Sequence, residues 1–359
     1  MVLAGGKNIG NSAPCFITFE AGPTHNGLES AKRLASYAAD AGADAVKFQI
    51  LDPDRLVADK KQPFSYQVLI DRTTGKSETV TESLYEILCR RAMTREEWKK
   101  LKGHCDELHL AFFATVGFDD EIELLEELGC DSIKIASADV NHFPLIRRAA
   151  RTGMYIQLDT GNATIGEVEQ AVDIIVSEGN MNIIIHNCPS GYPARLESIN
   201  LKLIPMLKQL FQFPVGFSDH TPGWDMDIAA VALGADLVEK TITEDRTTRS
   251  VEHIMSLEPS DMHAFIRKIR ELEIALGNSR RILHPAELEK RKAIRRSAFL
   301  KLPVSKGQSV NAEQIEFKRP GYGIAPNEFE KLEFAVFAKD LPAGHMIRFE
   351  DLKGAPCDE

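Results

Sequence analysis

The chain has 359 residues, of which 43% are hydrophobic and 27% charged, and its formal net charge at pH 7 is −10. This composition is typical of a folded globular protein, and the length suffices for a large core plus a second, small domain. The acidic balance argues against a surface for nucleic acid or anionic membranes, although an anionic substrate could enter a locally basic pocket. The sequence shows neither a membrane-spanning stretch nor a signal peptide, so we expect a cytoplasmic protein.

The cysteines are scattered along the chain without a C-x-x-C pair. They are Cys15, Cys89, Cys105, Cys130, Cys188 and Cys357. Most of them lie within apolar or helical patterns. This favours reduced, partly buried thiols over a disulfide framework or a zinc cluster.

Short apolar runs alternate with helical patterns along most of the chain. The runs predict eight strands: one at 15–20, a second that ends at 47–49, and others at 110–115, 132–136, 154–158, 182–187, 213–217 and 237–240. Helices are predicted between them, for example at 94–108, 119–128, 164–177 and 199–210, and a last helix, capped near Ser260, runs to about 276. Each strand leads into a polar loop. The pattern predicts a (β/α)8 barrel of the TIM type, in which functional groups collect at the carboxyl ends of the strands. A doubly wound sheet is the alternative, but a G-x-G-x-x-G turn is missing.

Two regions depart from this alternation. Residues 50–92 are polar, irregular and long for a loop inside a domain, which predicts a functional insertion or a segment that covers the substrate. After about residue 278 a basic, polar stretch leads into two similar half-units with Gly turns. We therefore predict a barrel domain over 1–278, a linker over 279–295 and a small β-rich domain over 296–359.

A helix, a glycine and a strand follow one another in three similar segments. These are GADAVKFQ (42–49), GCDSIKIA (129–136) and GADLVEKT (234–241). Glycine can end a helix in the left-handed conformation, and Lys47, Lys134 or Lys240 lies near the end of each strand. We expect Lys47 and Lys134 to form a positive floor for a phosphate or a carboxylate. A pair of solvated lysines at the rim is the alternative.

Other polar side chains also follow the predicted strands. Glu20 and Asp139 could act as acid and base or hold a sugar hydroxyl, unless they only pair with the lysines. His220 could be a metal ligand or a general base, and His25 is either a turn residue or a site residue. Four short hydroxyl groups could contact an anion or simply stabilise turns: Thr115, Ser137, Ser190 and Ser218.

Taken together, these motifs resemble those of a known family. PTHNG after Glu20, VKFQ, IKIASAD-N-FP, CPSGYP, GFSDHT, ALGADLVEK and SLEP occur in the order found in the sialic acid synthases, which make N-acetylneuraminate, legionaminate or pseudaminate. That family includes the spore-coat polysaccharide protein E group. FKRPGYGI, from Phe317 to Ile324, resembles the C-terminal antifreeze-like (SAF) domain of the same proteins. The resemblance covers nearly the whole chain except 50–92.

The resemblance implies that phosphoenolpyruvate condenses with an N-acylated amino sugar aldehyde to give a nonulosonic acid and phosphate. It assigns phosphoenolpyruvate binding to Lys47, Gln49, Thr115, Lys134, Ser137, Ser190 and Ser218. It places Glu20, Asp139 and Tyr192 around the reacting centre or the sugar. Arg319 would reach the N-acyl end of the sugar from the partner subunit of a domain-swapped homodimer.

The resemblance also implies a divalent metal, Mn²⁺ or Mg²⁺, that two histidines hold and that activates the aldehyde. His220 matches the first histidine, whereas Thr241 replaces the second. Glu252 stands where an Asp that contacts the sugar is usual, and Asp159 where a Ser is usual. These departures from the family pattern affect the parts of the site that the resemblance assigns to the metal and the sugar.

The departures leave several hypotheses open. The one we favour is a synthase for an altered acceptor, with metal held weakly or through Glu239, Asp139 or His253. The second is a metal-independent synthase in which Lys240 or His220 polarises the aldehyde. A Schiff-base aldolase using Lys134 and a non-catalytic relative are the others.

Overall fold

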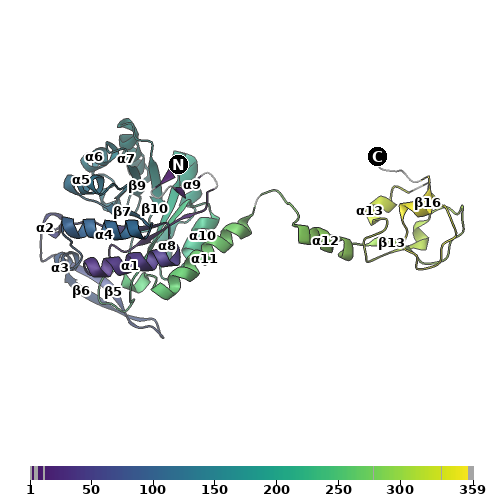
Figure 1. Cartoon of the computed structure of the whole chain (residues 1–359), viewed down its shortest axis with the longest axis horizontal. Coiled ribbons are helices and arrows are strands. Elements are labelled where there is room, and N and C mark those ends of the chain that lie inside the picture. The colour runs from purple at the N-terminus through teal and green to yellow at the C-terminus, as the bar shows by residue number, and fades with distance from the viewer. Residues whose placement is uncertain (1, 4–6, 11–12, 278, 333, 355–359) are drawn as a thin grey trace. The chain divides into compact units, whose positions relative to one another are not determined.

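The computed structural model describes residues 2–3, 7–10, 13–277, 279–332 and 334–354. The chain divides into two compact units, residues 1–277 and 278–359. Figure 1 shows the first as strands surrounded by helices, and the second as short strands with a few short helices.

Eight parallel strands form a closed barrel, as predicted. They are β3 (Phe16–Glu20), β4 (Ala45–Gln49), β7 (Ala111–Thr115), β8 (Ser132–Ile135), β9 (Tyr155–Asp159), β10 (Ile183–Asn187), β11 (Val215–Asp219) and β12 (Leu237–Thr241). Neighbours in the chain pair in the barrel, and β12 closes the ring by pairing with β3. The carboxyl ends of all eight strands therefore meet at one end of the barrel.

Helices cover the outside of the barrel and connect its strands. They are α1 (Leu28–Ala41), α4 (Arg95–Glu107), α5 (Asp119–Glu127), α6 (Phe143–Ala150), α7 (Ile165–Ser177), α8 (Leu196–Ile199), α9 (Leu203–Phe211), α10 (Asp225–Ala232) and α11 (Pro259–Leu276), with 3-10 turns η2 (Ser137–Asp139) and η3 (His253–Met255). Thr94 caps α4 in a capping box, as predicted, and Gly42 ends α1 with φ 88°. The last helix, α11, was predicted to be capped near Ser260, and its N-cap is Glu258, two residues earlier.

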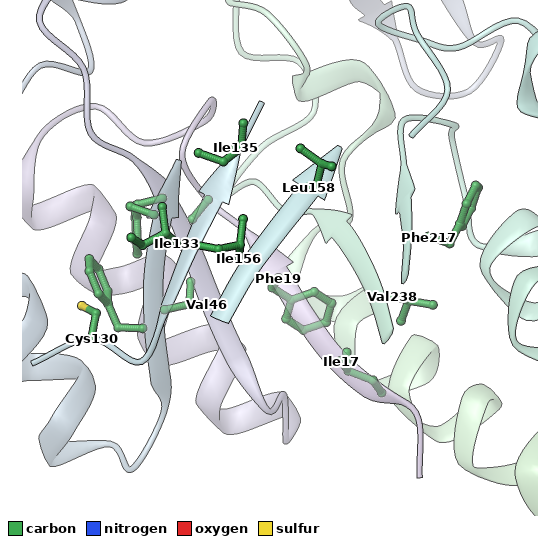
Figure 2. Close-up of a cluster of buried hydrophobic side chains, with 14 of the residues drawn as sticks. Ile17, Phe19, Val46, Cys130, Ile133, Ile135, Ile156, Leu158, Phe217 and Val238 are labelled. Carbon is green, nitrogen blue, oxygen red and sulfur yellow. The ribbon is translucent and has the colours of Figure 1, made fainter. Parts of the chain in front are cut away.

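Alternation along the strands separates two environments. One set of side chains packs outward against the helices, including Ile17 and Phe19 on β3 and Ile133 and Ile135 on β8. Figure 2 shows this cluster, with Phe217 directed toward the helices. The other set points into the barrel. Its lowest members form a separate apolar layer together with Ile9, which precedes the first barrel strand: Phe16, Ala45, Ala111, Phe113, Ile184 and Leu237. Polar side chains above this layer form the floor of the site.

The prediction that residues 50–92 are irregular was wrong. They form α2 (Pro53–Leu56), an antiparallel hairpin of β5 (Pro63–Asp71) and β6 (Lys76–Ser83), and α3 (Leu84–Cys89). Figure 1 shows the hairpin extending away from the barrel strands. A small cluster secures the segment, because Tyr66, Val68, Val80 and Ile87 pack with Val251. Residues 50–92 therefore form an ordered segment, which we call the wall, and not an irregular loop.

The second unit contains α12 (Pro285–Ile294), β13 (Ser297–Leu300), η4 (Ala312–Gln314), β14 (Ile315–Lys318), α13 (Pro326–Phe329), β15 (Val336–Phe337), η5 (Phe349–Asp351) and β16 (Leu352–Lys353). Two antiparallel pairs, β13–β14 and β15–β16, enclose an apolar core of its own. The predicted linker region thus includes a helix, α12, whose residues are not buried. At the start of the chain, β1 (Val2–Leu3) pairs with β2 (Lys7–Asn8).

The cysteines in the described ranges are free thiols, buried except for Cys89, as expected; Cys357 lies outside those ranges. Among the described residues, none of the helices combines the length and the apolar character needed to cross a membrane.

Candidate active site

A cavity of about 320 Å³ opens at the carboxyl ends of the barrel strands. We call it the main cavity. Many of the predicted site residues line it: Glu20, Lys47, Gln49, Thr115, Ser137, Asp139, Tyr192, Ser218, His220 and Glu252. Strand ends supply its floor, and the wall from the 50–92 segment adds apolar side chains such as Phe64, Leu84 and Ile87. The cavity is thus polar at the barrel and apolar on the opposite side.

Two buried lysines and one glutamate form the centre of the floor. Glu239 Oε1 lies 2.7 Å from Lys47 Nζ and accepts a 2.9 Å hydrogen bond from Ser218 Oγ. Glu239 Oε2 lies 2.9 Å from Lys134 Nζ. Lys47 also forms an ion pair with Glu20. Both lysines are at least 96% buried, so the alternative of solvated rim lysines is wrong.

The charges in this group stabilise one another. Although burial alone would lower the pKa of Lys47, Glu20 and Glu239 raise it well above its usual value. Burial would raise the pKa of Glu239, but Lys134 and Lys47 hold it well below its usual value. Lys47 is therefore an ammonium and Glu239 a carboxylate at neutral pH.

Lys134 connects this group to a second set of polar residues. Its Nζ lies 2.8 Å from Asp159 Oδ1 and 3.2 Å from His186 Nδ1. The other nitrogen of His186, Nε2, lies 3.0 Å from Gln157 Oε1. Burial first, and then Lys134, lower the pKa of His186 well below its usual value, so the ring is neutral. A neutral ring can accept a hydrogen bond from the Lys134 ammonium.

Sequence reasoning missed the role of Glu239 and placed Lys240 incorrectly. Lys240 points outward, where it pairs with Asp219, lies 3.8 Å from Asp227 on α10 and donates to the Thr221 carbonyl at 2.5 Å. It cannot reach the main cavity, so the hypothesis that Lys240 polarises an aldehyde is wrong. The spacing from the glycine in each segment would have identified the residue that points into the barrel. Lys47, Lys134 and Glu239, not Lys240, each stand five residues after the glycine of their segment.

The upper part of the cavity contains an imidazole and an aromatic ring. His220 Nδ1 lies 2.9 Å from the Pro189 carbonyl oxygen and so donates to it, which leaves Nε2 with a free lone pair. Burial lowers the pKa of His220, which favours the neutral ring. The Tyr192 ring lies 4.7 Å from the His220 ring, measured between centroids.

Two further acids and one arginine complete the lining. Burial, followed by the charge of Glu20, raises the pKa of Glu252 to about 8, and its backbone is left-handed at φ 68°. Burial also raises the pKa of Asp139. Arg91, directly after α3, reaches the same cavity and donates to Gln49 Oε1 over 3.5 Å. Sequence reasoning did not select Arg91, because the segment that carries it was predicted to be irregular.

Comparison with protein families identifies the relatives of this chain. The model of the NeuB family matches residues 34–281, and that of the SAF domain matches residues 295–353. The chain belongs to the NeuB family. The resemblance and the prediction of an enzyme are thereby confirmed.

Relatives of this NeuB protein match most of its length. N,N'-diacetyllegionaminic acid synthase of Legionella pneumophila is 33% identical over 358 residues, 98% of each chain. The spore coat polysaccharide biosynthesis protein spsE of Bacillus subtilis is 32% identical and covers 99% of both chains, with a TM-score of 0.64. The N-acetylneuraminic acid synthetase of Leptospira borgpetersenii, solved with citrate, is 30% identical and covers 79% of this chain and 92% of its own, with a TM-score of 0.68.

Not every predicted residue of the NeuB protein lines the main cavity. Ser190 and Lys134 are not among its lining residues, and Lys134 is fully buried beside Glu239. His25 and His253 line a different cavity, so the hypothesis of a metal held through His253 at this site is wrong. Arg319 follows β14 in the second unit, which is described separately.

The residues of this NeuB protein do not fit the metal that the resemblance implies. His220 Nε2 is one suitable donor, but the Thr241 hydroxyl is a poor ligand for Mn²⁺. Glu239 already binds two lysines and a serine. In the part of the chain that the structure describes, three His, Cys, Asp or Glu side chains nowhere come together in a way that could hold a metal ion. We therefore derive no chemical step from a metal.

Proposed function

We propose that this enzyme condenses phosphoenolpyruvate with an N-acylated amino sugar aldehyde and releases a nonulosonic acid and phosphate. The observation that carries the proposal is the floor of the main cavity, where Lys47 and Glu239 line the cavity together with hydroxyl and amide side chains, and the buried Lys134 pairs with Glu239. Relatives that span nearly the whole chain are named as synthases of such acids, which supports the same reaction.

The floor suits the anionic substrate. Lys47 Nζ and the hydroxyls of Thr115 and Ser137 lie at the ends of the neighbouring strands β4, β7 and β8, and they can donate to the oxygens of a phosphate or carboxylate. The site lies below the wall of the 50–92 segment, so bound phosphoenolpyruvate is partly shielded from water. Shielding strengthens each of these electrostatic contacts.

The reaction needs groups that move protons around the new bond. In the proposed sequence, C3 of phosphoenolpyruvate bonds to the aldehyde carbon, and the aldehyde oxygen takes a proton to become a hydroxyl. Water then adds at C2 and gives up one proton, and the resulting C2 hydroxyl gives up its second proton to the departing phosphate as the C2–O bond to phosphate breaks, which leaves a keto group at C2. Asp139 and Glu252 have raised pKa values and can supply a proton, and the neutral His220 can accept one.

The alternatives find less support in these contacts. A Schiff base requires that a lysine amine reach the substrate carbonyl, whereas Lys134 is fully buried, does not line the main cavity, and lies within 2.9 Å of two carboxylate oxygens. We also propose, following the resemblance, that the enzyme works in the cytoplasm as a domain-swapped homodimer in which Arg319 of one subunit serves the barrel of the other.

The experiment that tests the function measures phosphate release from phosphoenolpyruvate with a panel of N-acyl amino sugars, first in EDTA and then with Mn²⁺. Because the donor set does not fit a metal, we expect turnover to persist in EDTA and to change little when Mn²⁺ is added. Strict dependence on Mn²⁺ would contradict the expectation that the enzyme needs no metal, but it would not contradict the proposed condensation. If phosphoenolpyruvate does not bind, the proposed function is wrong. Borohydride trapping of Lys134 with a keto substrate would point to an aldolase instead.

A further inference from the structure

Arg91 is a buried cation without a carboxylate partner. Its side chain is 95% buried, yet none of the described acidic residues lies within ion-pair distance of its guanidinium. Its Nε has no hydrogen-bond partner, and its one side-chain hydrogen bond, to Gln49 Oε1, is long at 3.5 Å. A buried guanidinium is costly unless an anion or several acceptors satisfy it.

The nearest acids do not compensate for this charge. Glu252 is the acid that acts most strongly on Arg91, but its own pKa of about 8 leaves it mostly protonated at neutral pH. Glu20 acts second and is already paired with Lys47. Arg90, the neighbour in sequence, pairs with Glu82 and adds only repulsion. The charge of Arg91 therefore remains available to a ligand.

The lysines of the floor differ from Arg91 in this respect. Lys47 and Lys134 are shared among three carboxylates, those of Glu20, Glu239 and Asp159. Each lysine of the floor is therefore already paired with two acidic side chains. Arg91, by contrast, lines the same cavity with its charge uncommitted. An anion that enters the cavity would therefore be attracted most strongly to Arg91, because the charge of Arg91 is not already paired.

We propose that Arg91 binds an anionic group, a carboxylate or a phosphate, of a substrate in the main cavity and thereby selects that substrate. The inference rests on the proposed function. The anionic group could belong to phosphoenolpyruvate, or it could be a substituent on the acceptor sugar. The guanidinium can offer two parallel N–H donors to either group, which a lysine at the same place could not do.

The test compares the full-length enzyme with Arg91→Gln and Arg91→Lys. Binding of phosphoenolpyruvate alone is measured by calorimetry, and KM is measured for one N-acyl amino sugar with and without a phosphate ester. Losing a charge-assisted contact should weaken binding of the anionic substrate about 10- to 100-fold. Weaker phosphoenolpyruvate binding assigns the group to phosphoenolpyruvate. A lost preference for the phosphorylated sugar, with phosphoenolpyruvate binding unchanged, assigns it to the acceptor.

Arg90→Gln is the matched control, because it removes the same group one residue earlier, where Glu82 already pairs with it. The inference is overturned if Arg91→Gln changes both quantities no more than Arg90→Gln does. If Arg91→Gln fails to fold, Arg91→Lys decides: wild-type binding and KM values in that variant would overturn the inference, and weaker binding would support it. A wild-type enzyme that binds no phosphoenolpyruvate would instead overturn the proposed function, and this inference with it.

Discussion

Glu239 shows how much one side chain can organise in a barrel of this kind. It holds both floor lysines and the Ser218 hydroxyl, and it is 97% buried. We expect Glu239→Gln to lower the free energy of unfolding by about 3 kcal/mol, because removing one partner leaves buried charges uncompensated. Urea denaturation would measure the loss, and calorimetry should show weaker phosphoenolpyruvate binding.

Glu244→Gln is a suitable control for that substitution. Glu244 pairs with Arg33 on the outside of the molecule, where half of the Arg33 side chain is exposed. Water screens such a pair, so breaking it should change stability little. Equal losses in the two variants would argue that the charges of the floor are not specially coupled.

Glu252 should make the KM of the acceptor sugar depend on pH. Below its pKa of about 8 the protonated carboxyl can donate a hydrogen bond, and above it the carboxylate can only accept one. If the acceptor accepts a hydrogen bond from Glu252, its KM should be lowest below pH 8 and rise above it. In Glu252→Gln the amide donates at every pH, so this rise should disappear. A rise of the same size in the variant would show that another group titrates.

At the scale of the elements, packing inside the barrel requires a small residue on β11. A Cβ atom on Gly216 would lie 2.8 Å from His186 Nδ1, and the ring of His186 fills the barrel beside Lys134. We therefore expect Gly216→Ala to destabilise the enzyme by about 1–3 kcal/mol, as overpacking does. It should also weaken phosphoenolpyruvate binding, because the displaced ring no longer supports Lys134.

Gly103→Ala provides the opposite case. Gly103 lies within α4, and a Cβ atom there would meet nothing within 4 Å. Alanine is the better helix former, so thermal melting should show a gain of up to about 1 kcal/mol. A loss in this variant comparable to that of Gly216→Ala would mean that the contact with His186 is not the cause.

The elements that could be predicted from the sequence were those with strong local signals. The eight strands were found because their apolar runs alternate with amphipathic helices and follow glycines such as Gly42. The hairpin of β5 and β6 was missed because its residues are mostly polar or half exposed, so it lacks the apolar pattern of a buried strand. Lys240 was misplaced because closeness to a strand end does not reveal which face a side chain takes.

At the scale of the whole molecule, the proposed swap of units between subunits can be tested by complementation. We expect Lys47→Ala and Arg319→Ala each to be inactive or severely impaired. If Arg319 serves the partner's barrel, one site in each mixed dimer is intact, so a refolded equal mixture should recover roughly a quarter of wild-type turnover. If Arg319 serves its own barrel, the mixture should recover nothing.

The floor and the wall of the site differed in how well the sequence predicted them. The lysines and hydroxyls of the floor follow barrel strands, whose carboxyl ends must meet. Arg91 belongs to the wall, and its place depends on how a hairpin and a short helix pack, which no local pattern records. The partner of Arg319 depends on assembly, which a single sequence does not specify.

The division between floor and wall has an evolutionary consequence. Strands β4, β8 and β12 hold the barrel together and also carry the floor, so substitutions there risk the fold itself. The 50–92 segment leaves the barrel after β4 and returns at α4, and it packs largely through a cluster of its own. A lineage could therefore rewrite this segment and acquire a new acceptor while it inherits the phosphoenolpyruvate chemistry unchanged. Exchanging residues 50–92 between related enzymes would imitate that history in a single step.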